Sequence, residues 1–429
     1  MDMKWMRIAA AAAVTVFSAA WAMGPAPLMA QQTLRIIGPT GGAVKALTED
    51  LIPAFQTATG VKVEGIFLPQ DGLTQKAMTE FVSRAPSFDA IMFETSWGGR
   101  YAPFLDDLQP YVIKAGAAYD EADILAAARG MGIADGKTVG LPYRTLGRML
   151  YYRKDLFQEA GLSEPPKTLP QMLEYAQKLT KGDVYGLAIL GKQGFGNAYE
   201  FGSYLFSSGG TWWDRKSYEV RINDPIGVKA LGFYADLRNK QKVVPPEVTT
   251  WAWDEWIAGA QNGRYAMTIM HVPYATQIED PKLSKTAGKW GWADAPGWDS
   301  LAQGAPPVGG WLWGLPAESR QKALAWQFIA YVTGKEAQLK SALNANAPSR
   351  RSAFMSPELK AKWPWAEVAL RSLDRGTPMY NNPEELEAEA ALAVNVSEAL
   401  LGAKTAQQAA DESAAKLKQI LEKAGRYKK

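Results

Sequence analysis

The chain has 429 residues, which is too long for one ordinary hydrophobic core and predicts two or three domains. Its composition, 47% hydrophobic and 21% charged, is that of a globular protein. The formal net charge is +3 and acidic and basic residues are interspersed, which argues against a nucleic-acid-binding protein. Cysteine is absent and His271 is the single histidine, so we expect no metal site, no cofactor and no catalytic thiol or Ser–His triad.

Residues 1–30 are typical of a secretory signal peptide. Lys4 and Arg7 give a positive start, and residues 8–20 form an apolar stretch that is too short for a stable membrane anchor. Cleavage is expected after Ala30, with Ala22 as the alternative. An exported chain without cysteine has no disulfide and no lipid-acceptor cysteine. We therefore predict a soluble protein of a Gram-negative periplasm that is not lipid-anchored.

The first part of the mature chain alternates short apolar runs with helical patterns. Strands are predicted at residues 34–37, 61–67 and 90–93, with helices between them. This order predicts an α/β fold with an open parallel sheet and right-handed crossovers. Such sheets bind ligands outside the carboxyl ends of their strands. The residues predicted at that edge are Thr40, Gly41, Gly42, Gln70, Asp71, Glu94, Ser96 and Trp97.

Two of these predictions have a plain alternative. Gly41 and Gly42 can expose backbone N–H groups to an oxygen-rich ligand, or they can simply make a turn. Glu94 can bind ligand hydroxyls, or it can be a solvated loop acid.

A second α/β unit with its own core is predicted after residue 140. Its helices and strands are expected at 169–179 (capped by Thr168), 185–190, 197–208, 225–237, 256–262 and 266–270. Three elements follow: a strand-like run at 309–316, a helix at 322–332, and a helix with Asn382 as its cap and Pro383 in its first turn. A capping box at Thr405 starts the last helix, which ends at Gly425.

Residues 251–313 hold eight of the 16 tryptophans, in three pairs spaced two apart. In an extended strand this spacing places both indoles of a pair on one face. Flat indoles can stack on the C–H face of a sugar ring, but most tryptophans are buried in a core. Trp256, Trp290 and Trp298 are assigned to packing, while Trp251 and Trp253 could do either.

Several short motifs, in order along nearly the whole mature chain, resemble extracellular solute-binding proteins of carbohydrate ABC transporters, the class that includes the maltose-binding protein. Each motif is weak alone, and their order and spacing carry the resemblance. They are residues 59–63, 140–161, 166–168, 208–210, 262–267, 309–311 and 325–329.

The resemblance implies two α/β lobes joined by crossover strands near residues 142–145, 290–293 and 345–349. The lobes would comprise residues 31–142 with 293–345, and residues 143–292 with 346–429. Such a protein closes about a hinge on its solute, and a membrane permease reads the closed form. The resemblance thus implies a monomeric sugar, polyol or oligosaccharide receptor with ABC permease subunits as partners and no catalysis.

The resemblance also implies which residues face the cleft. Tyr274, after Pro273, matches an aromatic contact, and its neighbour His271 could bind a hydroxyl or be packed. The remaining matches are Asn197 and Tyr199 on a helix, Glu94, Ser96 and Trp97 after the third strand, Gly310 and Trp311, and Arg350 after the last crossing. Asn197 replaces an acidic residue of the family, which argues against a maltose-like ligand.

Two further functions stay open. Arg144 and Arg350 could bind an anionic sugar derivative, or they could form surface ion pairs. A secreted glycoside hydrolase would need two facing carboxylates, and Asp254 and Glu255 are adjacent and point apart. For the receptor, replacing Tyr274 or Trp311 with alanine should weaken ligand binding without unfolding the protein.

Overall fold

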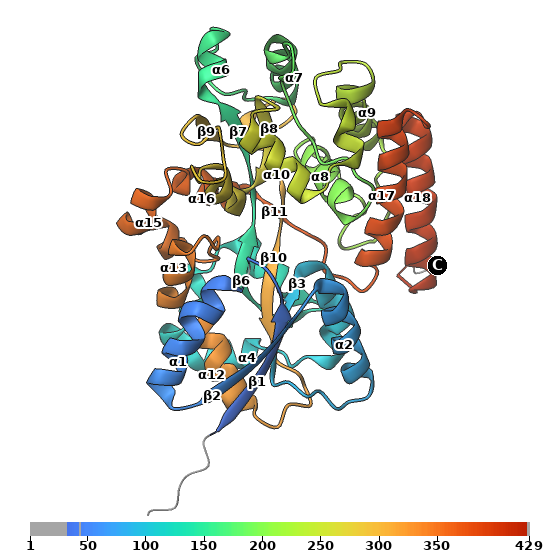
Figure 1. Ribbon diagram of the computed structural model, residues 1–429. Helices are drawn as coiled ribbons and strands as arrows, with labels where there is room; N and C mark the ends of the chain where they lie inside the picture. The colour runs from blue at the N-terminus through green and yellow to red at the C-terminus, as the bar shows by residue number, and fades with distance from the viewer. Residues whose placement is uncertain (1–31, 43, 427–429) are drawn as a thin grey trace, which may run out of the picture.

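The protein has two lobes, shown in Figure 1 for a computed structural model that describes residues 32–42 and 44–426. The predicted signal peptide lies outside the described residues. We call the lobe that contains β1 the N-lobe and the lobe that contains β7 the C-lobe. Within the described residues, no helix combines the length and the apolar character needed to cross a membrane.

The N-lobe is built on one mixed sheet. Three parallel strands, β1 (Thr33–Pro39), β2 (Lys62–Leu68) and β3 (Ala90–Glu94), confirm the predicted open parallel arrangement. On the other side of β3, β10 (Pro307–Gly314) runs antiparallel and pairs with β6 (Leu141–Leu146) and with the short β11 (Thr377–Pro378). All five residues of β3 and all eight of β10 are buried, so these central strands carry the core of the lobe.

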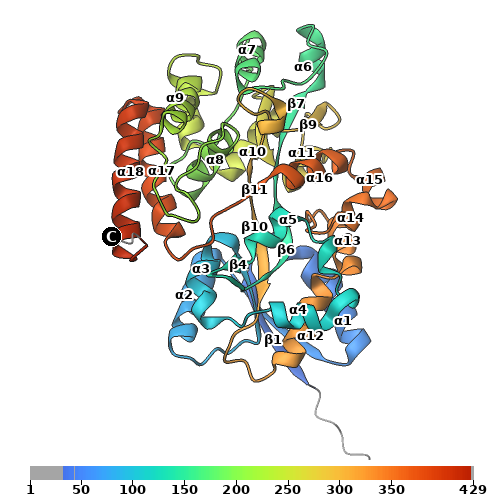
Figure 2. The same ribbon diagram turned by 180° about the vertical axis from the view of Figure 1, so that it is seen from behind.

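Helices cover both faces of this sheet (Figures 1 and 2). They are η1 (Leu47–Leu51), α1 (Ile52–Thr59), α2 (Gln70–Val82), α3 (Gly98–Tyr101), α4 (Gln109–Ala115), α5 (Ala126–Met131), α12 (Lys322–Val332) and α13 (Lys335–Leu343). Short 3-10 turns complete the lobe at η2 (Thr95–Trp97), η3 (Ala102–Phe104), η4 (Gly116–Ala118) and η5 (Glu121–Asp123), with a small hairpin of β4 (Ile133–Ala134) and β5 (Lys137–Thr138).

The C-lobe has an antiparallel sheet with β7 (Arg148–Arg153) between β8 (Met267–His271) and β9 (Trp290–Ala293). Its helices are α6 (Lys154–Glu159), α7 (Leu169–Leu179), α8 (Phe195–Phe206), α9 (Pro225–Asn239), η6 (Pro246–Thr250), α10 (Trp253–Asn262), η7 (Val272–Tyr274), α11 (Ala275–Ile278), α17 (Glu385–Leu401) and α18 (Ala406–Lys423). Figure 2 shows α17 and α18 side by side on the outside of this lobe.

Two capping predictions are confirmed and two other local predictions are wrong. Thr168 accepts a hydrogen bond from the Gln171 N–H at 3.2 Å, and Thr405 forms its capping box. Asn382 does not cap α17, because its amide donates to Glu384 and the helix begins at Glu385. Residues 185–190 do not form a regular strand, although Ala188 N–H still donates to Met267 O at 2.9 Å.

The chain crosses between the lobes along extended segments. β6 pairs within the N-lobe sheet and β7 within the C-lobe sheet, so the chain changes lobe at Gly147. A Cβ at Gly147 would lie 2.6 Å from Leu373, which explains a glycine at this crossing. β9 leads through η8 (Leu301–Gln303) into β10 as a second connection. The lobe boundaries drawn from the sequence stay a prediction.

A third connection runs beside β6. Thr145 N–H donates to Ala347 O, and the Ser349 hydroxyl donates to Pro142 O, both at 2.9 Å. Beyond it, α14 (Arg351–Met355), α15 (Pro357–Lys362) and α16 (Ala366–Arg375) lie beside the junction of the lobes (Figure 2). α16 contacts both β7 and α5, so it packs against both lobes.

The tryptophans that the sequence assigned to packing do lie in packed surroundings, and the structure adds two more to the core. Trp256 and Trp290 are fully buried, and Trp298 packs edge-on against Phe233 at 5.3 Å. Trp212 and Trp213 are both buried around Tyr380, whose ring centroid lies 4.2 Å from that of Trp213. Tyr380 arrives from a distant part of the chain, so the sequence around these tryptophans carries no sign of it.

Candidate ligand-binding cleft

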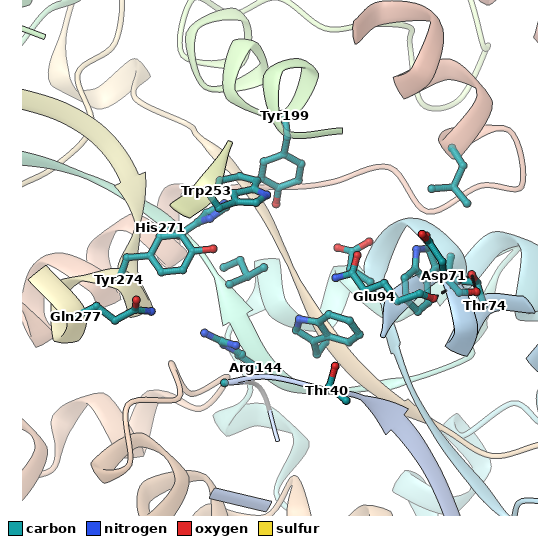
Figure 3. Close-up of a pocket in the computed structure, with 16 residues that line it drawn as sticks. Thr40, Asp71, Thr74, Glu94, Arg144, Tyr199, Trp253, His271, Tyr274 and Gln277 are labelled. Atoms are coloured by element: carbon teal, nitrogen blue, oxygen red, sulfur yellow. Dashed lines mark hydrogen bonds between the residues drawn. The ribbon is translucent and has the colours of Figure 1, made fainter. Parts of the chain in front are cut away.

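A cavity of about 510 Å³ lies between the lobes. Figure 3 shows Thr40, Asp71, Glu94 and Arg144 on one side and Tyr199, Trp253, His271 and Tyr274 on the other. Most of the residues predicted from the sequence line it: Thr40, Gly42, Gln70, Asp71, Glu94, Trp97, Arg144, Tyr199, His271, Tyr274 and Trp311. They come from β3, β6 and β10 of the N-lobe and from the turns and helix starts that follow its strands, and from α8, β8 and η7 of the C-lobe.

Arg350 is not a cleft residue, although the sequence suggested it. Its side chain is fully buried and donates to the carbonyl oxygens of Thr333, Asp120 and Tyr119 at 2.7 to 2.9 Å. An ion pair to Asp123 at 3.6 Å completes its partners. Arg350 therefore holds the segment after the third connection against the N-lobe.

Asn197 is also outside the cavity wall. Its amide donates to Ala393 O at 3.0 Å, which ties α8 to α17. The helix places Tyr199 toward the cavity and Asn197 toward α17, so only one of the two predicted α8 residues lines the cleft.

Gly41, Ser96 and Gly310 support the wall without lining it. Gly41 is exposed at the turn and has a φ of 100°, which favours glycine. The backbone N–H and the hydroxyl of Ser96 both bond to Glu94. A Cβ at Gly310 would lie 2.0 Å from Arg144 O, so this glycine permits the close approach of β6 and β10.

Arg144, Trp311 and Glu94 form a row across three strands of the N-lobe sheet. Trp311 on β10 is in register with Glu94 on β3 and with Arg144 on β6. Residues in register on neighbouring strands project to the same face. All three line the cavity, so the floor of the cleft has an indole flanked by a guanidinium and a carboxyl group.

Glu94 is fixed by its own turn. Its Oε2 accepts from the Ser96 N–H at 2.7 Å and from the Ser96 hydroxyl, as a cap of η2. Burial raises the pKa of Glu94 to about 7, although the bonds from Ser96 act in the opposite direction. The carboxyl group therefore changes its protonation state near neutral pH.

This pKa predicts a pH-dependent affinity. A ligand hydroxyl that donates to Glu94 favours the ionised carboxylate, so affinity should rise as the pH rises through about 7. Titration calorimetry at pH 6 and pH 8 would measure this change. The Glu94→Gln variant, which does not titrate, should show a flat profile, and an equally steep profile in that variant would contradict the assignment.

Trp97 and Trp311 are fixed against each other. Their ring centroids lie 5.6 Å apart and their planes make an angle of 86°. Only 7% of Trp97 and 6% of Trp311 are exposed, although both line the cavity. Each indole is therefore mostly packed and offers one limited surface to a ligand.

The C-lobe wall is an aromatic cluster that we call the upper wall: Tyr199, Trp253, His271 and Tyr274. Trp253 stacks on His271 with ring centroids 5.0 Å apart, and Tyr274 lies 6.2 Å from Trp253 and 5.6 Å from His271. Tyr199 lies 5.6 Å from His271 on the other side. The upper wall thus faces the row on the N-lobe with flat rings.

His271 is a neutral imidazole in this wall. Burial lowers its pKa well below the usual range, and the nearby Arg148 and Arg144 act in the same direction. Neither ring nitrogen has a hydrogen-bond partner within the described residues. A neutral imidazole has one donor and one acceptor, which suits a ligand hydroxyl.

A buried ion pair lies behind the upper wall. Arg148 on β7 contacts Glu200 on α8, and both side chains are fully buried. The guanidinium carbon of Arg148 lies 4.8 Å from the centroid of the Tyr199 ring. Burial lowers the pKa of Arg148 to about 10, which leaves it charged at neutral pH. This pair holds β7, where Arg148 is opposite His271 of β8, against α8, which carries Tyr199.

Five cavity residues were not predicted: Thr74, Leu146, Trp253, Gln277 and Leu386. Three of them share a face with a predicted residue. Thr74 lies four residues after Gln70 on α2, Gln277 lies three after Tyr274, and Leu146 lies two after Arg144 on a strand. These spacings would have allowed Thr74, Gln277 and Leu146 to be predicted from the sequence. Leu386 on α17 has no such signal, since its helix comes from the far end of the chain.

Comparison with known proteins agrees with this architecture. The family model of bacterial extracellular solute-binding proteins matches residues 38–339. The chain belongs to this family. Among its relatives is a probable amino-acid ABC transporter periplasmic-binding protein of Sinorhizobium fredii, 27% identical over 92% of this chain and 91% of the relative. The mannitol-binding protein of Pseudomonas aeruginosa is 28% identical over 75% of this chain and 74% of the relative.

A solved structure shows the same fold. The maltose-bound MalE3 of T. maritima superposes with a TM-score of 0.80 at 27% identity, covering 91% of this chain and 100% of that one. The two-lobed α/β fold expected from the sequence is thereby confirmed. Members of this family are solute-binding receptors of ABC transporters, and the protein described here has their fold and an inter-lobe cavity.

Proposed function

We propose that this protein is the periplasmic receptor of an ABC importer and captures a sugar or polyol between its lobes. The composition of the cavity carries the proposal: flat aromatic rings on both sides, with polar groups between them. Rings pack on C–H surfaces, and guanidinium, carboxyl, imidazole and amide groups bond to hydroxyls. Relatives named for mannitol and maltose support this ligand class.

Capture would proceed by hinge closure about the connections near 142–147, 290–306 and 345–349. We keep the two moving bodies proposed from the sequence, residues 31–142 with 293–345 and residues 143–292 with 346–429, except that the first boundary lies at Gly147, so that Arg144 moves with β6 and the N-lobe. The ligand shifts the population toward the closed state because it contacts both lobes only there. Permease subunits in the inner membrane would then recognise the closed monomer. Export by the signal peptide, without a lipid anchor, completes this proposal.

Two other functions are less well supported. An anionic sugar derivative would need a basic cleft, but Arg144 shares the floor with Glu94 and Asp71, and Arg350 is engaged elsewhere. A glycoside hydrolase would turn over its ligand. Glu255 is occupied in bonding the Ala252 N–H at 2.9 Å, so the adjacent Asp254 and Glu255 do not form a catalytic pair. We propose that no bond is made or broken.

The test is a binding panel with the purified protein. Sugars, alditols, sugar acids and amino acids are compared by thermal shift and calorimetry, and the amino acids are included because one relative is named for them. A ligand at one hundred times its Kd should add about 2.7 kcal/mol to the unfolding free energy. Stabilisation by sugars or alditols is expected. Binding of amino acids alone, or release of a cleaved product, would overturn the proposal.

Tyr274 gives a sharper test of the cleft assignment. Replacing it with alanine removes the ring that closes the upper wall over Trp253 and His271. We expect affinity for the ligand to fall about tenfold or more, which corresponds to about 1.4 kcal/mol. Tyr175→Ala on α7, a half-buried tyrosine outside the cavity, is the matched control. Equal affinities for the two variants would place the ligand elsewhere.

A further inference from the structure

We propose that the cleft selects its ligand by length: Arg144 and Glu94 bind the two ends of one molecule whose middle lies on Trp311. This inference rests on the proposed function and adds the feature that discriminates among sugars and polyols. It follows from the register of three strands and from the unequal hydrogen bonding of the two end groups.

The sheet sets the distance between the two ends. Arg144, Trp311 and Glu94 are opposite one another on β6, β10 and β3. Neighbouring strands lie roughly 4.8 Å apart, so the backbones of the first and third residues are roughly 10 Å apart. This separation belongs to a buried sheet, so a ligand cannot change it as it could change the shape of a loop.

The Glu94 carboxyl group is oriented by its own turn. Ser96 bonds to Oε2 and not to Oε1, and Glu94 lines the cavity. Oε1 and the Tyr199 hydroxyl both lie against Gly309, where a Cβ would be 3.5 Å from the first and 2.3 Å from the second. Glycine at this position therefore leaves room for the Tyr199 hydroxyl beside Oε1. Tyr199 and Leu386 both line the cavity together with Glu94.

The Arg144 end has a cation that pairs with no described residue. Its side chain makes no hydrogen bond or ion pair within the described part of the chain, and its Nε is buried without a partner. Figure 3 shows it below Tyr274 and Gln277, with Glu94 farther across the cavity. A guanidinium donates in parallel to two oxygens, so vicinal hydroxyls suit this end.

Trp311 prevents a short ligand from compensating by sliding. Its indole is held edge-on by Trp97 and is almost fully packed, so the platform between the ends does not move with the ligand. A ligand that is too short reaches one end and leaves the other polar group dehydrated without a partner when the lobes close. Ligands that span both ends should therefore bind at least tenfold more tightly than shorter ones.

The experiment combines ligand length with substitutions at each end. Tetritols, pentitols, hexitols and disaccharides are titrated against the full-length mature protein, Arg144→Met and Glu94→Gln at pH 8, where Glu94 is ionised. For the ligand that binds best, each substitution should weaken binding about tenfold. For a shorter ligand, only one substitution should matter, because only one end is occupied. Arg100→Met, an exposed arginine outside the cavity, controls for lost charge.

The outcomes separate this inference from the proposed function. If no sugar or polyol binds, the proposed function fails. If they bind but both substitutions weaken long and short ligands equally, or if either substitution has no effect on any ligand, the length selection alone is overturned. Melting temperatures of the variants without ligand show whether each one is folded, and Arg144→Lys tests the bidentate contact separately from charge.

Discussion

Replacing Arg148 with methionine is expected to lower the unfolding free energy by about 3–5 kcal/mol. Arg148 and Glu200 are fully buried, and they form an ion pair between β7 and α8. Removing only the arginine leaves the Glu200 carboxylate in an apolar interior without a counter-charge. The loss should exceed the cost of the side-chain volume, because methionine fills much of the same space.

Urea unfolding of three variants would measure this loss. Arg148→Met with Glu200→Met removes both charges, so the double variant should recover most of the stability of the unsubstituted protein. Lys240→Met is the matched control, since Lys240 pairs with Asp236 at 2.9 Å but is 72% exposed. Its effect should stay within about 0.5 kcal/mol. A single Arg148 variant as mild as this control would show that the buried pair contributes little.

The position of the floor residues could be predicted because a topological rule applies to them. Glu94 and Trp97 follow a buried strand, and ligands of parallel sheets bind where such strands end. The row with Arg144 was beyond the sequence, because its register is set by pairing between segments more than 150 residues apart. The sequence therefore predicted which residues form the floor of the cleft, but it did not predict that they lie in one row.

Side-chain direction explains the predictions that failed. Arg350 and Asn197 stand where the resemblance placed cleft residues, but each bonds to backbone carbonyls on the side away from the cavity. A motif match predicts the position of a residue along the chain, but it does not predict which groups its side chain will bind. Trp253 shows the converse: it starts α10 and joins the upper wall, a choice that the tryptophan spacing left open.

The start of α17 shows a similar limit. Glu385 and Glu389, which the sequence does not mark as interior residues, are both buried and lie one turn apart on α17. Neither makes an ion pair with a described residue, and none of their four carboxyl oxygens has a hydrogen-bond partner within the described residues. Two buried carboxylates one turn apart repel each other and lack the hydration of free carboxylates, which favours a proton on at least one of them.

This pair should make stability fall as the pH rises. Burial raises the pKa of both groups well above the usual range, and Glu94 acts in the same direction on each, while Arg215 opposes it for Glu385. A raised folded-state pKa means that the folded protein keeps protons that the unfolded chain releases above about pH 4.5. The stabilisation is complete below that pH and is lost as the pH rises through the folded-state values.

Each retained proton should cost about 1.4 kcal/mol of stability per pH unit between those two limits. Urea unfolding at several values from pH 5 to pH 8 would show this slope in the unsubstituted protein. Glu385→Gln with Glu389→Gln keeps the shape and removes the titration, so the slope should flatten and the variant should be the more stable protein at pH 8. The titration of His271 acts at the acidic end in all variants alike.

Glu387→Gln is the control that separates burial from charge. It lies on the same helix between the two buried acids but is exposed, so its substitution should leave the slope unchanged. Parallel profiles for the double variant and this control would mean that Glu385 and Glu389 are hydrated in the folded protein and have ordinary pKa values, which would contradict the prediction. A flattened profile in the double variant alone would show that Glu385 and Glu389 keep protons in the folded protein at neutral pH. Glu94, which raises the pKa of Glu389, also lines the cavity and links this pair of acids to the ligand site.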